Sequence, residues 1–172
     1  MARNVEVKAR IDDIEKLKVK VAGIADKCPI EIFQDDTFFT CPNGRMKLRT
    51  FSDTEAELIF YRRPNQSGPK ESVYSIAPIA SPDKTREVLS QGYGQTGRVR
   101  KHRTLFLIGR TRVHLDRVEG LGDFIELEVV LADKEPTEAG VVVANKLLDK
   151  LGISSDRLIE GAYVELLNKG VD

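Results

Sequence analysis

Two carboxylates stand two residues apart in the stretch "DRVEGLGDFIELEVV", residues 116–130. Glu126 and Glu128 alternate there with apolar residues, as in a strand with one polar and one apolar face. Asp116 lies just across a Gly-rich turn from them. Carboxylate oxygens are the ligands that Mg²⁺ and Mn²⁺ prefer. The stretch therefore indicates a place where a divalent metal could sit between protein carboxylates and an anionic substrate.

Basic residues recur at the same spacing of two in other stretches. They are Lys8 and Arg10 after Glu6 in "VEVKAR", Lys47 and Arg49 in "MKLR", Arg62 in "ELIFYRR", and Lys101 and Arg103 in "VRKHR". On any single strand, a charged face is most simply the one that meets water. Charges of both signs on most strands instead favour a barrel with a charged interior. Buried charges must then be compensated by one another, by a metal or by a ligand.

A triphosphate is the substrate that such a mixture of charges suits. Arg binds a phosphate as a bidentate fork, whereas Lys acts as a point charge. Carboxylates would repel the phosphates directly, but they can hold a divalent cation that bridges to phosphate oxygens. We therefore expect a site for a metal together with a small-molecule triphosphate.

Length and composition exclude several other classes of protein. The 172 residues are enough for one domain with a core, which we expect to span 1–172. The 27 basic and 27 acidic residues balance, so no net field attracts nucleic acid or an anionic membrane. No apolar run is long enough to cross a bilayer, and the N-terminus is unlike a signal peptide. Cys28 and Cys41 are too few for a disulfide framework, which favours the cytoplasm.

Periodicity and turn residues predict an α+β fold. Strands are expected at 4–11, 31–41, 45–51, about 55–62, 71–77, 99–108, 111–118 and 123–131. Helices are expected after Asp12 or Asp13, from Ser81-Pro82, from Pro136-Thr137 and near 155–168. Hairpin links imply an antiparallel sheet, and eight strands are enough to close a barrel. The expected architecture is an eight-stranded antiparallel β-barrel whose apolar outer face is covered by helices.

The ordered stretches "VEVKAR", "QDDTFF", "MKLR", "VRKHR", "HLDRVEGLGDFIELEVV" and "GAYVELL" resemble the CYTH superfamily, the triphosphate tunnel metalloenzymes. The match covers essentially the whole chain, and the "GLGDF" turn is most similar to the class IV adenylyl cyclase branch. The resemblance implies an eight-stranded tunnel, Mg²⁺ or Mn²⁺, and ATP, thiamine triphosphate or inorganic triphosphate as the substrate. It also implies a monomer or a homodimer.

The resemblance also implies roles for particular residues. The metal ligands would be Glu6, Glu126 and Glu128, with Asp116 as a supporting acid in the metal site. Phosphate would be bound by Lys8, Lys47, Arg49, Arg62, Lys101 and Arg103, with Arg10 on the same inward face. Catalysis would depend on Glu6 and on Lys8, which would orient or deprotonate the attacking water.

Two departures from the family pattern leave the activity open. Asn4 replaces the first Glu of the signature, and Ser75 stands where relatives often place a carboxylate. One hypothesis is an enzyme that cyclises ATP to cyclic AMP and pyrophosphate, or that hydrolyses a triphosphate. The alternative is a nucleotide- or polyphosphate-binding module without catalysis. His114 shares the inward side with Asp116, and a structural role is expected for it.

Overall fold

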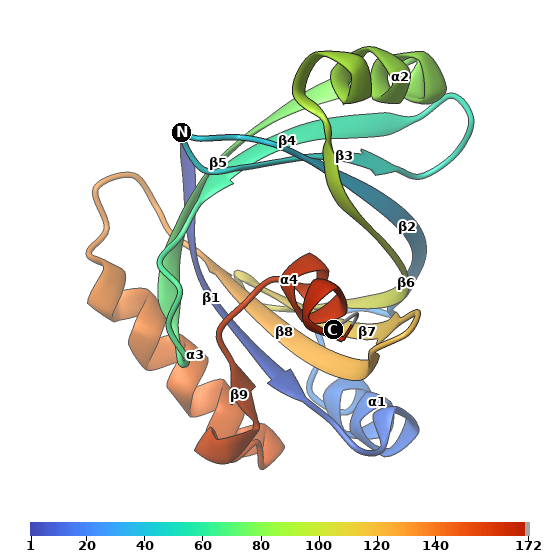
Figure 1. Cartoon of the computed structure of the whole chain (residues 1–172). Coiled ribbons are helices and arrows are strands. Elements are labelled where there is room, and N and C mark those ends of the chain that lie inside the picture. The colour runs from blue at the N-terminus through green and yellow to red at the C-terminus, as the bar shows by residue number, and fades with distance from the viewer. Residues whose placement is uncertain (171–172) are drawn as a thin grey trace.

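The computed structural model describes residues 1–170 and contains a closed antiparallel barrel of eight strands (Figure 1). The strands are β1 (Ala2–Arg10), β2 (Ile30–Phe39), β3 (Arg45–Thr50), β4 (Ala56–Arg62), β5 (Lys70–Ile79), β6 (Gln95–Ile108), β7 (Thr111–Val118) and β8 (Gly122–Val130). Their order around the barrel is β5-β4-β3-β2-β6-β7-β8-β1. Pairs from Ala2–Tyr74 to Glu6–Lys70 join β1 to β5 and close the ring. The predicted α+β barrel is confirmed.

Four helices pack outside the barrel: α1 (Ile14–Ala22), α2 (Pro82–Tyr93), α3 (Thr137–Leu151) and α4 (Tyr163–Lys169). The N-cap of α1 is Asp13, whose side chain accepts a hydrogen bond from the Lys16 backbone N–H at 3.0 Å. Pro82 occupies the first turn of α2, where its missing N–H costs no helical hydrogen bond. No helix in residues 1–170 is long and apolar enough to cross a membrane.

The alternation along β1 explains which face is charged. Val5, Val7 and Ala9 are at most 1% exposed and pack into a core cluster with residues of β7, β8, α1 and α3. In Figure 1, α1 and α3 lie against the outside of this part of the barrel. The intervening residues of β1, Glu6 and Lys8 among them, must therefore face the interior. Burial of the apolar side thus turns the charged side into the tunnel.

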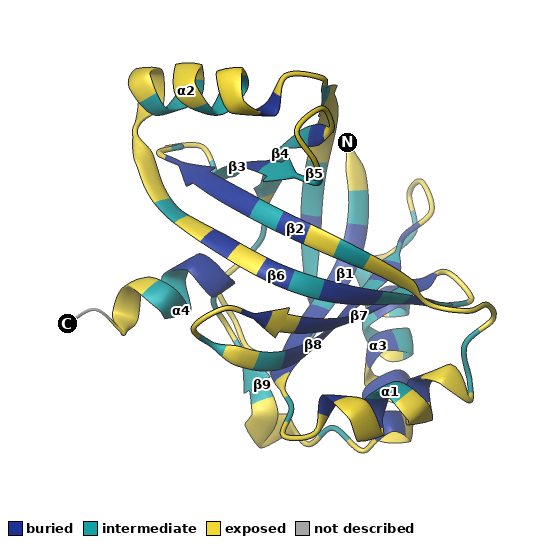
Figure 2. Cartoon of the chain, turned by 90° about the vertical axis from the view of Figure 1, so that its right-hand side faces the viewer, coloured by how far each residue is buried: buried dark blue, intermediate teal, exposed yellow. Residues whose placement is uncertain are grey.

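Three details of the architecture differ from the sequence expectation. The outer face of β2 and β6 is not apolar: buried inward residues alternate along these strands with more exposed outward ones (Figure 2), and exposed Arg98 on the outer face binds Asp35 at 2.6–2.7 Å. Strand β6 begins at Gln95 and not at residue 99, because Gly97 and Gln95 pair with Phe38 and Phe39 at the end of β2. The segment near 155–168 is not one helix. It contains a 3₁₀ turn (Ser155–Arg157), the short strand β9 (Leu158–Ile159) paired with β1, and then α4.

Candidate active site in the tunnel

The barrel encloses a cavity of about 390 Å³ that is lined by residues from all eight strands and by the start of α4. One part of its wall is rich in carboxylates and another is rich in cations, although each part also contains partners of the opposite sign. The acidic part comes from β1 and β8, and the cationic part comes from β3 and β6. Apolar and aromatic residues also contribute to the lining, among them Ile32, Phe51, Tyr74, Ile76 and Leu105.

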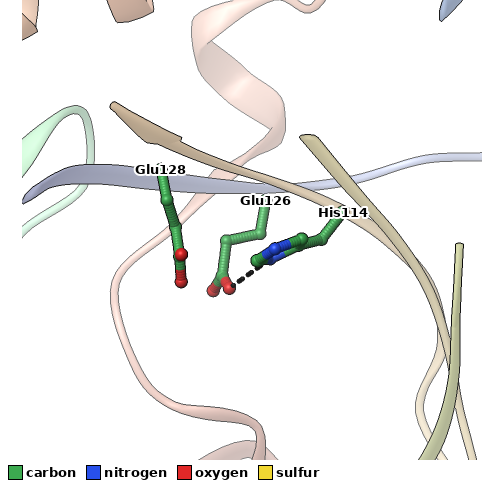
Figure 3. A group of neighbouring side chains, drawn as sticks. All are labelled: His114, Glu126 and Glu128. Atoms are coloured by element: carbon green, nitrogen blue, oxygen red, sulfur yellow. Dashed lines mark hydrogen bonds and ion pairs between the residues drawn. The ribbon is translucent and has the colours of Figure 1, made fainter. Parts of the chain in front are cut away.

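The acidic wall is formed by Glu6, Glu126 and Glu128, with His114 beside them. Glu6 and Glu128 are direct partners in the β1–β8 register, and Glu126 is the partner of His114 in β7–β8. His114 Nδ1 lies 3.3 Å from Glu126 Oε1. One potential ligand atom from each of His114, Glu126 and Glu128 lies within 4.8 Å of the others (Figure 3).

The carboxyls of the acidic wall differ in basicity. Burial and the nearby charge of Glu126 raise the pKa of Glu6, although Arg63 and Lys8 oppose the shift. Burial acts in the same sense on Glu126, but Lys8, His114 and Arg103 outweigh it and hold its pKa well below the usual range. Burial also lowers the pKa of His114, which favours the neutral imidazole that can bind a metal.

Lys8 connects the acidic wall to α4. Its Nζ lies 2.8 Å from Glu126 Oε2 and 4.0 Å from the centre of the Tyr163 ring. Arg63 extends from the end of β4 to Glu6, with Nε 2.8 Å from Glu6 Oε1. Arg112 of β7 likewise pairs with Glu128 Oε2 at 2.8 Å. All three acidic-wall glutamates therefore already have a cationic partner within the protein.

The cationic wall is organised around Asp36 of β2, which is 1% exposed. Arg49 binds both oxygens of this carboxylate, at 2.8 and 2.7 Å. Lys47 Nζ and Lys101 Nζ lie 3.1 and 3.2 Å from Asp36 Oδ2. The register brings these residues together, because β2 lies between β3 and β6 in the sheet. One buried carboxylate thus has three cationic neighbours, and the group carries a net positive charge.

Asp116 has a different place from the one expected. It is fully buried, it is absent from the cavity lining, and Arg103 binds both of its oxygens at 2.7 Å. The Tyr163 hydroxyl donates a third hydrogen bond to Asp116, at 2.8 Å. These donors leave Asp116 poorly placed to be a metal ligand. It instead orients Arg103, whose Nη2 also lies 3.4 Å from Glu126 Oε1.

Three further expectations need correction. Arg62 is exposed and points away from the tunnel, and the neighbouring Arg63 lines the cavity instead. Arg10 has the inward register, opposite Phe124, but it is the last residue of β1 and lies exposed beyond the cavity. Ser75 is exposed and does not line the cavity. Strand β5 contributes Ser72, Tyr74 and Ile76 to the lining instead.

Sequence reasoning gave no site role to Asp36, Arg63 or Tyr163. Asp36 stands in the quoted motif "QDDTFF", and its alternation with Gln34 and Phe38 was a usable signal of the inward face. Arg63 carried a weaker signal, because Ile59 and Tyr61 separate it from Glu57, the other charged residue on that face of β4. Tyr163 lies in the tunnel because the chain that follows α3 folds back against the barrel, and the local sequence does not indicate this.

The donor set of the acidic wall fits a divalent cation. It offers two carboxylates and one imidazole nitrogen from His114, Glu126 and Glu128. Asn4 also lines the cavity and is 3% exposed, and its Oδ1 has no hydrogen-bond partner among residues 1–170. A buried amide oxygen without a partner is costly unless a ligand completes it. Oxygen donors with one imidazole suit Mn²⁺ well and Mg²⁺ less closely.

Comparison with known proteins places this geometry in a family. The model of the CYTH domain matches residues 2–163. The adenylate cyclase CyaB of Aeromonas hydrophila is 25% identical, over 97% of this chain and 90% of its own length. A Methanocaldococcus jannaschii protein, provisionally named an adenylate cyclase, is 28% identical over 94% of this chain and 97% of its own.

Solved structures share the fold. A Pyrococcus horikoshii protein superposes with a TM-score of 0.84 at 22% identity, covering 96% of this chain and 99% of its own. A Hippeastrum protein, described as an adenylyl cyclase candidate with a dominant triphosphatase activity, has a TM-score of 0.67 at 15% identity, covering 99% and 96%. Because the family model covers nearly the whole sequence, the chain belongs to the CYTH domain family.

Proposed function

We propose that this protein is a divalent-metal-dependent enzyme that acts on a triphosphate inside the tunnel, with ATP cyclisation to cyclic AMP and pyrophosphate as the leading reaction. The observation that carries the proposal is the division of one cavity into a cationic wall and an acidic wall. The names of two full-length relatives support cyclisation.

Each wall has its own task in this proposal. Lys47, Arg49, Lys101 and Arg103 would bind the phosphates, and Glu126, Glu128 and His114 would hold Mg²⁺ or Mn²⁺. The bound cation would neutralise phosphate charge and stabilise the leaving group. Glu6, which lies close to this group, would complete the metal site or accept a proton.

The proposed reaction begins at the ribose of ATP. The 3′ oxygen attacks the α-phosphorus, the bond from that phosphorus to the β-phosphate oxygen breaks, and pyrophosphate leaves. Lys8 would orient the attacking oxygen, and Glu6, two residues away on the same face of β1, would take its proton. The apolar and aromatic part of the lining offers surface for the base of a nucleotide.

Hydrolysis is the second candidate, and the description of the Hippeastrum structure favours it. Water would then attack the terminal phosphorus of ATP, thiamine triphosphate or inorganic triphosphate, and phosphate would leave. The same two walls serve this reaction. The substrate is again a polyanionic triphosphate, and only the phosphorus atom that is attacked differs. A third candidate, binding without turnover, is favoured by Asn4, since an amide contributes less charge to a metal site than a glutamate does.

One assay separates the three candidates. The purified protein is mixed with Mg²⁺ or Mn²⁺ and, in separate reactions, with ATP, thiamine triphosphate or inorganic triphosphate. Cyclic AMP, pyrophosphate and phosphate are quantified, with Glu126→Ala as the inactive control. Cyclic AMP above the control supports the cyclase, and phosphate alone supports hydrolysis. Neither product, together with thermal stabilisation by the triphosphates, would reject the enzyme in favour of a binding module.

A further inference from the structure

The presence of Asp36 in the cationic wall is not explained by substrate binding alone. A carboxylate repels phosphate, yet this one lies fully buried inside the proposed phosphate site. Its oxygens meet Lys47, Arg49 and Lys101 at 2.7–3.2 Å. Within residues 1–170, none of these three cations has another acidic partner within ion-pair distance.

The charge balance of this cluster is unfavourable without a ligand. Three cations around one anion leave about two excess positive charges out of water, where like charges repel strongly. Burial lowers the pKa of Lys101 to about 7, and Arg49 adds to the shift while Asp36 opposes it. Burial and Arg49 lower the pKa of Lys47 to about 8, again against the effect of Asp36. In the empty tunnel, therefore, Lys101 is only partly charged near neutral pH, and Asp36 keeps the charge of the wall from falling further.

We propose that Asp36 is a positioning residue that acts as an internal counter-anion: it holds Lys47, Arg49 and Lys101 together in the empty tunnel, and a bound triphosphate then completes the charge of this wall through proton uptake. The inference rests on the triphosphate site of the proposed function, but not on turnover. It also explains why an acidic residue belongs in an anion site.

The groups around the two lysines come from five elements. Asp36 is on β2, Lys47 and Arg49 are on β3, Tyr61 is on β4, Lys101 and Arg103 are on β6, and Tyr163 is on α4. Burial raises the pKa of both tyrosines, so they stay neutral. The exchange of protons near neutral pH is thus assigned to the lysines.

Calorimetry tests the proposal without any need for catalysis. Metal-free protein is titrated with inorganic tripolyphosphate at pH 8 in two buffers with different ionisation enthalpies, which yields the number of protons exchanged. The protein contribution should be an uptake of about one proton, because both lysines gain charge on binding. Lys101→Gln should lower the measured number by half or more. Protonation of the ligand itself cancels in this comparison. Equal proton numbers for the two proteins would overturn the proposal.

Asp36→Asn tests the counter-anion itself, with Asp35→Asn as the matched control. Asp35 is the adjacent residue, but it faces outward and binds Arg98 and Arg100. At pH 7, Asp36→Asn should take up more protons on binding than wild type, because its lysines are more often neutral when empty. Its thermal midpoint should fall without ligand and recover more with tripolyphosphate.

A purely structural role for Asp36 would instead lower the midpoint equally with and without ligand and leave the proton number unchanged. That outcome would refute the inference. If Asp36→Asn fails to fold, the Lys101→Gln comparison still decides. Absence of tripolyphosphate binding to wild-type protein would also reject the inference, whereas the product assay tests the proposed function separately.

Discussion

Lys8 Nζ lies 2.8 Å from Glu126 Oε2, and the two side chains are only 9% and 10% exposed. The pair joins β1 to β8 inside the tunnel, at a point where the two residues are direct partners in the strand register. A proposed catalytic lysine and a proposed metal ligand are thus held by each other. Loss of either one leaves the other as a buried charge with fewer partners.

Glu126→Gln should therefore affect both activity and stability. The change removes a metal-ligand charge, so turnover should fall at least a hundredfold. It should also lower the free energy of unfolding by about 3 kcal/mol, because it breaks a buried ion pair. Product assays and urea unfolding measure the two effects. Glu15→Gln, at an exposed pair with Arg117, is the control and should change neither. Full activity in Glu126→Gln would remove this residue from the site.

Asn4→Glu should strengthen metal binding. The new carboxylate would join Glu6 and Glu128 on the acidic wall, where repulsion makes it unfavourable without a cation. The variant should be less stable than wild type in metal-free buffer and should bind Mn²⁺ at least tenfold more tightly. Thermal midpoints with and without Mn²⁺, together with calorimetric titration, test this. Asn4→Gln keeps the amide and should not tighten binding. Equal Mn²⁺ affinity in Asn4→Glu and wild type would place the metal elsewhere.

The sequence predicted the barrel and the acidic wall because both depend on local alternation. From Val5 to Arg10 in β1 and from Ile125 to Val129 in β8, apolar and charged residues alternate, so the inward face could be read from the strand itself. The same reasoning placed Arg62 in the tunnel, where the structure has Arg63. The run Leu58–Tyr61 interrupts the alternation of β4, and only pairing of this strand with β3 and β5 fixes which side is inward.

Contacts between distant segments were beyond the reach of the sequence. Asp36 gains its three cationic neighbours only when β3 and β6 flank β2. Tyr163 meets Asp116 across a separation of 47 residues, through a chain return that has no local signature. These interactions are created by closure of the barrel. A strand pattern predicts that closure, but it does not give the register in which the strands pair.

Tyr163→Phe should destabilise the protein but keep the aromatic ring in the tunnel wall. The hydroxyl donates to Asp116 at 2.8 Å, and its loss leaves a buried carboxylate with one donor fewer. The expected cost is about 1–2 kcal/mol in the free energy of unfolding. The ring still lies over Lys8, so triphosphate binding should persist. Urea unfolding and calorimetry measure the two quantities. Tyr74→Phe, which loses only a 3.4 Å contact with Arg112, should cost less; an equal or larger cost would contradict this account.

Gly140→Ala should destabilise α3, although alanine is the better helix former. Its Cβ would lie 2.6 Å from Val5 Cγ2 and 2.9 Å from Leu131 Cδ2. Overpacking of a core costs about 1–3 kcal/mol, whereas the gain in helix propensity is about 1 kcal/mol. We expect a net loss of about 1 kcal/mol in urea unfolding. Gly92→Ala in α2 meets no atom within 4 Å and should be neutral or stabilising. A stabilised Gly140→Ala would show that α3 can shift away from Val5 and Leu131 at little cost in free energy.

Lys101→Met should reduce the dependence of stability on pH. Burial lowers the pKa of Lys101 in the folded protein to about 7, from an ordinary value of 10.5. Between these values the unfolded chain binds more protons than the folded one, so the free energy of unfolding rises as the pH rises. Wild-type protein without ligand should thus gain stability from pH 7 to pH 9.5 in urea unfolding.

The gain should be smaller in Lys101→Met, which has no proton to lose there, but it should not vanish, because burial also lowers the pKa of Lys47, to about 8. Lys84→Met, at an exposed helical pair with Glu87, should follow the wild-type profile. If Lys101→Met gains as much stability with pH as wild type, then Lys101 stays charged in the empty tunnel, and the cationic wall needs no proton to bind a polyanion.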